Sequence, residues 1–516
     1  MWWPILLVLA AAPSSTVAAA APGAPVRLRV NYLVAPLSID EPRPRFSWAL
    51  AHAQRAQAQT SFRLVVTELA SNATVWDSGE VASNRSVNVQ LGADASLPLR
   101  SDADYAWAVA WRDAGSPPAW SAFANSTFST ALLDEAAWRG AEWVGSNAGP
   151  HVNALRAEFN VSAAGGGGAA VVARARLFIS GLGSVRTTLN GLQTDAHELG
   201  QHANPVTSIT RALYDVVDVT ALVNAGACNV LGAQLGGGWW AVKSWPWGFT
   251  GQRQLRALLS VTTAGGVAAP QYFASRVSAP NASALSKDLR FAAAAGPVTT
   301  DYVYDGETYD ARVAAALVGW DASCAFNASA GAWRPADAPG ATPASYGAVM
   351  SAHHLLVTAE DAEALAPVSI SQPAAANGSY VFDFGVNHAS QDELRIEGPC
   401  AAGSEVTILH GELLHADGTV WNQFLPSVPM ATHYVCAGLN GTSEAPYRSL
   451  FSSFGGRYAQ VSGLPSAPTA ATLASRFVHS ALPQVARFDS SSAALNALQA
   501  ATRRSLLSNM MVGAAA

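Results

Sequence analysis

Short apolar runs, interrupted every few residues by glycine, proline, asparagine or aspartate, fill most of this 516-residue chain, and the pattern is typical of β-strands joined by turns. The alternation is clearest at residues 105–112, where Tyr105, Trp107 and Val109 fall on one face of an extended strand. Seven such runs in the first quarter of the chain predict a β-sandwich. The predicted strands are 26–32, 45–50, 62–69, 74–77, 86–91, 105–112 and 126–130.

Three successive blocks share this strand pattern. The spacing of turns predicts an immunoglobulin or fibronectin III-like β-sandwich over residues 26–130. Residues 131–345 predict a jelly-roll domain, and residues 367–482 predict a second sandwich after a stretch rich in proline and alanine. The clearest strands of the later blocks are predicted at 170–179, 184–189, 229–235, 380–384, 393–397, 405–410, 432–436 and 458–462.

Two local signals stand out from the strand pattern. Asn190 and Gly191 predict a two-residue hairpin turn, because both residue types tolerate positive φ. After residue 489 the pattern changes to an amphipathic helix, which the side chain of Asp489 or Ser490 is expected to cap. Its apolar stripe has no partner among the few residues that follow. The stripe comprises Leu495, Leu498, Thr502 and Leu506.

The N-terminus predicts export. An apolar run over residues 5–12, followed by alanines at 18–20, is typical of a signal peptide spanning residues 1–20. No basic residue precedes Arg27, so an uncleaved anchor is the alternative, although about 10 apolar residues are too few to cross a bilayer. No later segment is long enough either, and we expect a secreted or lumenal protein without a membrane span.

Sequons and cysteines agree with export. Four cysteines allow three pairings, of which Cys228–Cys324 with Cys400–Cys436 keeps each bridge inside one predicted domain. Eight N-x-Ser/Thr tripeptides are potential glycosylation sites, although each could arise by chance. Their asparagines are Asn72, Asn84, Asn125, Asn160, Asn281, Asn327, Asn377 and Asn440. Together these features indicate a glycoprotein.

Charge argues against a nucleic-acid partner. Charged residues make up 13% of the chain, the net charge is −6, and lysine and arginine form no run. A nucleic-acid-binding surface requires a basic patch or stripe. We therefore expect no nucleic-acid partner.

Five stretches of the chain carry distinctive motifs. The opening stretch reads VRLRVNYLVAPLSIDEPRPRFSW, and another reads YVYDGETYDAR. The five stretches lie at residues 26–48, 214–240, 302–312, 382–418 and 454–464. They occur in the order found in α-L-rhamnosidases, and the chain resembles this family of glycoside hydrolases from residue 26 to residue 509.

The resemblance implies a mainly β chain whose final segment, residues 484–516, begins a truncated (α/α)6 catalytic barrel. In the family the acidic catalytic residues follow the position of Ser508 and Asn509, where this chain reads MMVGAAA and stops. No catalytic residue can therefore be transferred to it. An inverting glycosidase needs an acid and a base roughly 6.5–9.5 Å apart, and we expect the chain alone to be inactive.

A tryptophan-rich segment is the best candidate for sugar contact. Glycines at 236–238 let a ligand approach closely, and planar rings stack on sugar faces, although tryptophans in a core are the alternative. Acidic residues near 305 are expected mainly to form a polar turn, with Asp310 paired to Arg312. The candidate carbohydrate-binding residues are Trp239, Trp240, Trp245, Trp247, Asp305 and Glu307.

Metal chemistry has little support in the sequence. His197 and His202 are five residues apart, which does not fit a zincin helix, and His353-His354 is expected in a surface loop. We predict no cofactor. Some relatives bind rhamnose through calcium, so a calcium site is retained as an alternative. Its possible oxygen ligands are Asn190, Asp195 and Asn204.

The function implied by the resemblance is hydrolysis of terminal α-L-rhamnose from glycosides or polysaccharides, with this chain supplying the accessory β-region. The alternative is a secreted, non-catalytic carbohydrate-binding protein. In both cases the expected partner is a rhamnose-containing glycoside or polysaccharide.

Overall fold

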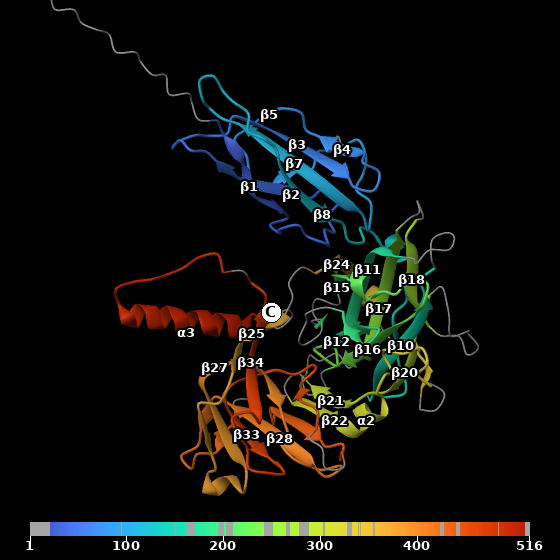
Figure 1. The fold of residues 1–516 in the computed structure, drawn as a ribbon, viewed down its shortest axis with the longest axis vertical. Helices are drawn as coiled ribbons and strands as arrows, with labels where there is room; N and C mark the ends of the chain where they lie inside the picture. The colour runs from blue at the N-terminus through green and yellow to red at the C-terminus, as the bar shows by residue number, and fades with distance from the viewer. Residues whose placement is uncertain are drawn as a thin grey trace, which may run out of the picture. The chain divides into compact units, whose positions relative to one another are not determined.

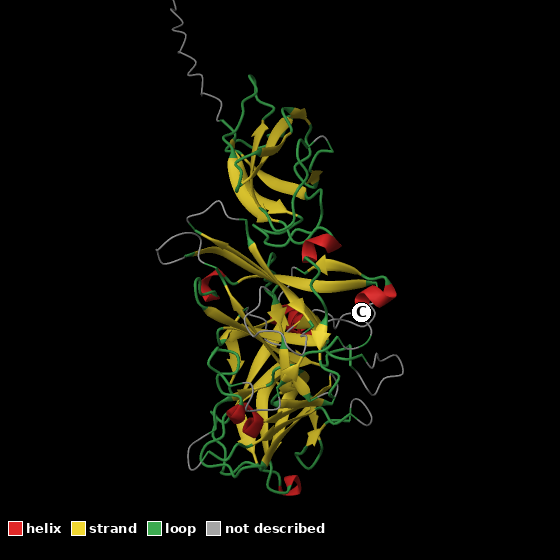
Figure 2. Ribbon diagram, turned by 90° about the vertical axis from the view of Figure 1, so that its right-hand side faces the viewer, coloured by secondary structure: helices red, strands yellow, loops and turns green. Residues whose placement is uncertain are grey.

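The computed structural model describes most of the chain beyond the N-terminal leader. The described residues are 21–93, 95–149, 151–162, 171–194, 201–202, 210–241, 251–264, 269–277, 288–302, 305–327, 333–338, 340, 342–353, 357–423, 428–439, 444–482 and 484–510. The predicted signal peptide lies outside them. The chain divides into two units, one ending at Leu133 and the other beginning at Asp134. Strands dominate both units, which confirms the mainly β prediction (Figure 2).

The first unit contains two sheets with strand orders β1-β2-β6 and β4-β3-β7-β8, and β5 pairs with β3 (Figure 1). Trp107 and Val109 of β7 are buried on the same side, as the alternation predicts. The strand predicted at 86–91 shortens to two residues, because Asn88 takes positive φ and interrupts it. The strands are β1 Gly23–Val30, β2 Arg45–Ala51, β3 Ser61–Glu68, β4 Thr74–Asp77, β5 Val81–Ala82, β6 Val89–Gln90, β7 Asp104–Arg112 and β8 Ala124–Ser129.

Two seven-stranded sheets begin the second unit, with orders β13-β12-β16-β10-β20-β23 and β19-β18-β17-β11-β15-β24, while β14 and β9 add to β12 and β17. Their strands are β9 Val144–Gly145, β10 Val152–Asn160, β11 Val172–Leu182, β12 Ser184–Leu189, β13 Leu192–Gln193, β14 Gln201–His202, β15 Arg211–Asp218, β16 Cys228–Gly236, β17 Gln254–Thr263, β18 Gln271–Arg276, β19 Leu289–Arg290, β20 Ala292–Ala295, β23 Arg334–Pro335 and β24 Val349–Ala352.

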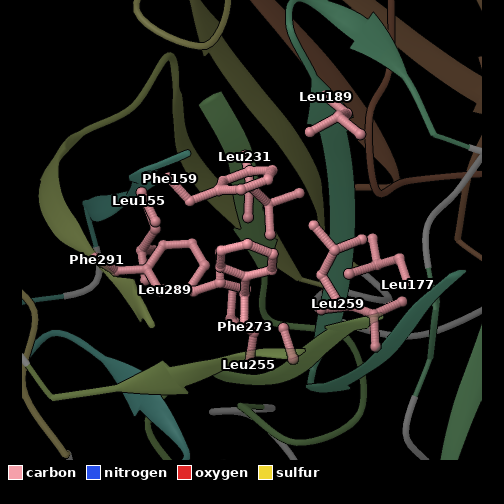
Figure 3. Packing of buried hydrophobic residues seen from close by; sticks show 14 of the residues in the cluster. Leu155, Phe159, Leu177, Leu189, Leu231, Leu255, Leu259, Phe273, Leu289 and Phe291 are labelled. Carbon is pink, nitrogen blue, oxygen red and sulfur yellow. The ribbon is translucent and has the colours of Figure 1, made fainter. Parts of the chain in front are cut away.

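Leucine and phenylalanine side chains from both sheets fill one apolar core (Figure 3). Phe159 of β10 meets Phe273 of β18 with ring centroids 5.0 Å apart. The predicted hairpin turn is confirmed, since Asn190 and Gly191 have φ of 54° and 81° between paired β12 and β13. Positive φ at both positions matches a turn of the primed type.

A ten-stranded sheet follows, with order β21-β22-β31-β28-β33-β27-β34-β25 and with β26 and β32 on β27. Its strands are β21 Val298–Tyr302, β22 Gly306–Asp310, β25 Val357–Leu365, β26 Ser369–Ser371, β27 Tyr380–Leu394, β28 Glu405–Gly411, β31 Ala431–Val435, β32 Tyr447–Arg448, β33 Phe454–Ser462 and β34 Leu473–Ser480. A short pair, β29 Leu413–Leu414 with β30 Val420–Trp421, and helix α2 Ala311–Ala316 complete the β-region.

This sheet differs from the sequence prediction at two points. Strands β21 and β22 fall within the block 131–345, yet β22 pairs with β31 of the later block. The strand predicted at 380–384 and the first two residues of the one predicted at 393–397 belong to one strand, β27, which ends at Leu394. A register shift after Asp383 absorbs Gly385 without ending the strand. Pairing with distant strands, which local sequence does not show, decides both features.

Helix α3, Ala493–Asn509, confirms the predicted helix but begins later than expected. Ser492 is its N-cap, accepting from the Leu495 amide at 3.4 Å, so the prediction of Asp489 or Ser490 as the cap is wrong. The leucines of the predicted stripe, Leu495, Leu498 and Leu506, are 50%, 62% and 56% exposed.

The C-terminal end of α3 contacts the ten-stranded sheet instead. Leu507 is buried, the Ser508 hydroxyl accepts from the Ala389 amide at 3.3 Å, and Arg504 lies 5.2 Å from the Phe477 ring centroid. In the part of the chain that the structure describes, no helix is long and apolar enough to cross a membrane.

Both disulfides that keep a bridge within one predicted domain are present. Cys228 pairs with Cys324, and Cys400 pairs with Cys436. The structure therefore selects one of the three pairings that the sequence allows.

Candidate functional site

The glycine run after β16 lies where several backbones meet. A Cβ on Gly236 would come within 2.6 Å of the Phe451 ring, and one on Gly237 within 2.9 Å of the Asp301 carbonyl. Gly183, with φ of 96°, abuts the same run, since a Cβ there would lie 2.2 Å from the Gly236 carbonyl oxygen. Close chain packing thus explains these glycines without any ligand.

The candidate tryptophans differ in their surroundings. Trp240 is 1% exposed, donates from Nε1 to the Gln252 carbonyl at 3.0 Å and packs with Trp143 and Leu182. Its ring has no free face for a sugar, which agrees with the core alternative. Trp239 is partly exposed. Trp245 and Trp247 lie outside the described residues.

Of the two candidate acids, Glu307 is the more deeply enclosed. Glu307 of β22 is fully buried and accepts hydrogen bonds from the Tyr447 hydroxyl at 2.8 Å, the Leu450 amide at 3.0 Å and the Phe451 amide at 2.8 Å. Asp305 is only partly buried in the turn before β22, where its carbonyl accepts from the Ala431 amide at 3.0 Å. Glu307 therefore holds the 447–451 segment against the β21–β22 hairpin.

Burial shifts the protonation of Glu307. Loss of solvent raises its pKa to about 7, although the hydrogen bonds from Leu450, Phe451 and Tyr447 act in the opposite direction. The charge of Asp301 adds to the rise. Near neutral pH this carboxyl group is therefore balanced between its two protonation states.

Asp301 completes this buried cluster, although the sequence did not single it out. It lies opposite Glu307 in the β21–β22 hairpin and forms an ion pair with Arg253. It also accepts from the Gly237 amide. Burial raises its pKa to about 6, while Arg253 and Gly237 act to lower it. The cluster joins the β21–β22 hairpin to the glycine run at 236–238. Because its carboxylate oxygens are buried and hydrogen-bonded, its role is structural.

Three family models match the chain in succession. They describe a Rha78A-like N-terminal immunoglobulin domain at residues 25–134, an alpha-L-rhamnosidase N-terminal domain at residues 170–352, and a bacterial alpha-L-rhamnosidase concanavalin-like domain at residues 374–479. The chain belongs to the α-L-rhamnosidase family. The three matches together cover most of its length, in the order that the sequence motifs indicate.

Curated relatives and solved structures are similar to this rhamnosidase-family chain. An alpha-L-rhamnosidase of Streptomyces avermitilis is 29% identical over 83% of the chain and 38% of its own length, and one of Formosa agariphila is 26% identical over 84% and 44%. The alpha-L-rhamnosidase structure from Dictyoglumus thermophilum has a TM-score of 0.79 at 25% identity, covering 95% of this chain and 52% of that one. The chain thus spans about half the length of these relatives, or less.

A solved Streptomyces avermitilis alpha-L-rhamnosidase, in complex with L-rhamnose, shares the fold. Its TM-score is 0.77 at 21% identity, and the match covers 96% of this chain and 60% of that one. A match over 96% of this chain includes most of both units.

A second buried polar cluster in the rhamnosidase-family chain escaped the sequence analysis. His388 Nε2 lies 2.9 Å from the Ser475 hydroxyl, and His410 Nδ1 lies 3.5 Å from an Asp392 carboxylate oxygen. Burial raises the pKa of Asp392 to about 6 and lowers that of His410 to about 3. These residues come from β27, β28 and β34, so their sequence separation gives no motif.

Three further acids, on or near the strands of the ten-stranded sheet, have side-chain partners. Asp310 pairs with Arg312 at 2.8 Å, as predicted, and also caps α2. Asp383 forms two hydrogen bonds of 2.8 Å to Arg457, while Glu412 accepts from Asn387 at 2.9 Å. These contacts are structural.

The calcium alternative gains no support from the described residues. Asn190 uses its Oδ1 to accept from the Val230 amide at 2.9 Å and its Nδ2 to donate to the Leu222 carbonyl at 2.8 Å. Asp195 and Asn204 lie outside the described residues. His353, expected in a surface loop, lies 3.0 Å from Asp215.

Proposed function

We propose that this chain forms the β-domain region of an α-L-rhamnosidase, which hydrolyses terminal α-L-rhamnose from glycosides or polysaccharides, and that the chain has no hydrolytic activity by itself. The observation that supports inactivity is the burial of the acidic residues whose pKa values are raised. Asp301, Glu307 and Asp392 have pKa values raised to about 6 or 7, and all three are buried.

A glycosidase requires two carboxyl groups that flank the sugar bond, and an inverting enzyme separates them by roughly 6.5–9.5 Å to admit water. Asp301 and Glu307 are neighbours across a hairpin, but both are enclosed. The Asp301 carboxylate already pairs with Arg253 and accepts from the Gly237 amide, while the Glu307 carboxylate accepts from three donors. A sugar cannot reach either group without unfolding the hairpin.

The test is an assay of the purified chain on an aryl α-L-rhamnoside. We expect no turnover above the blank, while an α-L-rhamnosidase of full family length, used as positive control, hydrolyses the substrate. Turnover that Glu307→Gln or Asp301→Asn abolishes, and that the control Asp417→Asn leaves unchanged, would contradict inactivity. Asp417 is a suitable control because its side chain is exposed and, among the described residues, accepts hydrogen bonds from Thr419 in its own turn.

A second candidate function is non-catalytic binding of rhamnose-containing glycans. Trp239 favours it, because this indole is partly exposed beside the enclosed Trp240. Aromatic rings at a surface can stack on sugar faces. Calorimetry with L-rhamnose and rhamnosides tests this function: Trp239→Ala should abolish binding, while Trp120→Ala, which removes another exposed indole, should not. Absence of binding by the unaltered chain removes this candidate.

We further propose that the chain is secreted or lumenal. All four cysteines are in disulfides. Structural disulfides persist mainly in oxidising compartments. Expression in a secreting eukaryotic cell should release the chain to the medium, and deletion of residues 1–20 should retain it inside the cell.

A further inference from the structure

We propose that five asparagines of this chain carry N-linked glycans on their amide nitrogens. The proposal depends on export, as proposed above, and is independent of any rhamnosidase activity. The five residues are Asn72, Asn84, Asn125, Asn160 and Asn377.

Exposure is the first observation. All five asparagines of this glycan set are exposed, and they lie in different parts of the fold: β8 contains Asn125, β10 ends at Asn160, and Asn377 occupies a turn with φ of 46°. By contrast, Asn153 and Asn229, which are not in sequons, are 1% and 0% exposed. A glycan is too large to attach at a buried amide.

Use of the side-chain amide is the second and more telling observation. None of the five side chains in the glycan set takes part in a hydrogen bond within the described structure, whereas eight of the eleven described asparagines outside sequons donate from Nδ2; Asn31, Asn147 and Asn224 are the exceptions. These donors are Asn88 to Tyr32, Asn153 to Val298, Asn190 to Leu222, Asn229 to Asn224, Asn387 to Glu412, Asn422 to Pro429, Asn496 to Ser490 and Asn509 to Ser505.

The contrast extends to exposed residues. Asn387, Asn496 and Asn509 are as exposed as the glycan set, yet each amide is engaged. Surface position alone therefore does not account for the difference. The five amide nitrogens of the glycan set are both exposed and unused in hydrogen bonds among the described residues.

The amide nitrogen is the atom that forms the bond to the sugar. The amide nitrogen attacks C1 of an oligosaccharide carried on a lipid diphosphate, forming an N–C1 bond as the C1–O bond breaks. The lipid diphosphate leaves with the electron pair, and the nitrogen loses a proton. The hydroxyl residue that completes each sequon is present at the required spacing. These residues are Thr74, Ser86, Thr127, Ser162 and Ser379.

The glycan on Asn125 has an additional structural consequence. Strand β8 is at the end of the sheet order β4-β3-β7-β8, and Asn125 pairs with Ala108 of β7 on its inner side. Exposed edge strands can pair with other chains unless something covers them. A bulky sugar at Asn125 blocks such pairing.

The other three sequons are not part of the proposal. Asn327 is exposed, but it already interacts with another residue in the structure. Asn281 and Asn440 lie outside the described residues.

Peptide mapping of the full chain from a secreting eukaryotic cell tests the proposal. Treatment with peptide-N-glycosidase converts each glycosylated asparagine to aspartate, and mass spectrometry locates the conversion. We expect conversion at all five residues of the glycan set and none at Asn387 or Asn509. Secreted chain without conversion at these five residues, or with conversion only at Asn281 and Asn440, overturns the proposal.

Variants of one sequon provide matched controls. Asn125→Gln and Thr127→Ala should each remove one glycan by intact mass, while Thr127→Ser, which keeps the sequon, and Asn88→Gln should retain all of them. Asn125→Gln should also increase self-association in size-exclusion chromatography, which Asn84→Gln should not. Equal association of the two variants contradicts the edge-covering role of the Asn125 glycan.

Discussion

The interior between the two seven-stranded sheets differs from that of the ten-stranded sheet. The first is filled by an apolar cluster that includes Phe159, Leu231 and Phe273. The second also buries titratable groups, among them Glu307 and His410. Both regions are β-structure in one chain, yet the first gains stability from removal of apolar surface from water, which does not depend on pH. The stability of the second region depends on pH, because burial favours the neutral form of a titratable side chain over its charged form.

The largest expected effect is in the apolar interior. Phe159→Ala removes a fully buried ring that contacts Phe273, and we expect a loss of about 3–5 kcal/mol of unfolding free energy. Urea unfolding measures this loss, which should be similar at acidic and neutral pH. Val318→Ala is the control, because Val318 is 79% exposed. A loss below 1 kcal/mol, roughly that of a surface substitution, would show that this core is not tightly packed.

The second-largest expected effect is a dependence of the unfolding free energy on pH, which comes from the buried acids of the ten-stranded sheet. Glu307 has a pKa of about 7 in the folded chain against a usual 4.5, so its protonated form is favoured by folding. Its stability contribution is complete below about pH 4.5 and is lost as pH rises through about 7, on the order of 3 kcal/mol. Asp301 and Asp392 act in the same direction as their pKa values of about 6 are passed.

Histidine opposes this trend at acidic pH. The pKa of His410 is lowered from 6.5 to about 3, so folding favours its neutral form and stability is lost as pH falls below 6.5.

Comparison of the unfolding free energy of Glu307→Gln with that of the unaltered chain isolates the contribution of the Glu307 carboxyl group. Between about pH 5 and about pH 8, the fall in unfolding free energy should be smaller in the variant by on the order of 3 kcal/mol. Equal pH profiles would contradict the burial of a titrating Glu307, and Asp417→Asn should leave the profile unchanged.

The smallest expected effect concerns α3, which combines an exposed stripe with a buried C-terminal contact. Ser492→Ala removes the N-cap and should cost about 1 kcal/mol in local helix stability, measured by amide hydrogen exchange at residues 493–496. Asp489→Ala removes the cap expected from the sequence and should have no such effect. Faster exchange in Asp489→Ala but not in Ser492→Ala would reverse the assignment.

Local sequence determined much of this protein. Alternation in β7 identified the strand and its buried face, and Asn190-Gly191 identified a hairpin, because side-chain direction and permitted φ are properties of adjacent residues. Five ordered motifs indicated the rhamnosidase family, and the three family models agree. Two disulfides were among the pairings that the sequence allowed.

Only the tertiary structure decided which candidate site residues are accessible. Trp239 and Trp240 are adjacent in sequence, yet one is partly exposed and the other enclosed. Glu307 is fixed by Tyr447 and Phe451, about 140 residues away. Burial and hydrogen-bond partners depend on strands brought together from distant parts of the chain, and local residue patterns carry no record of those contacts.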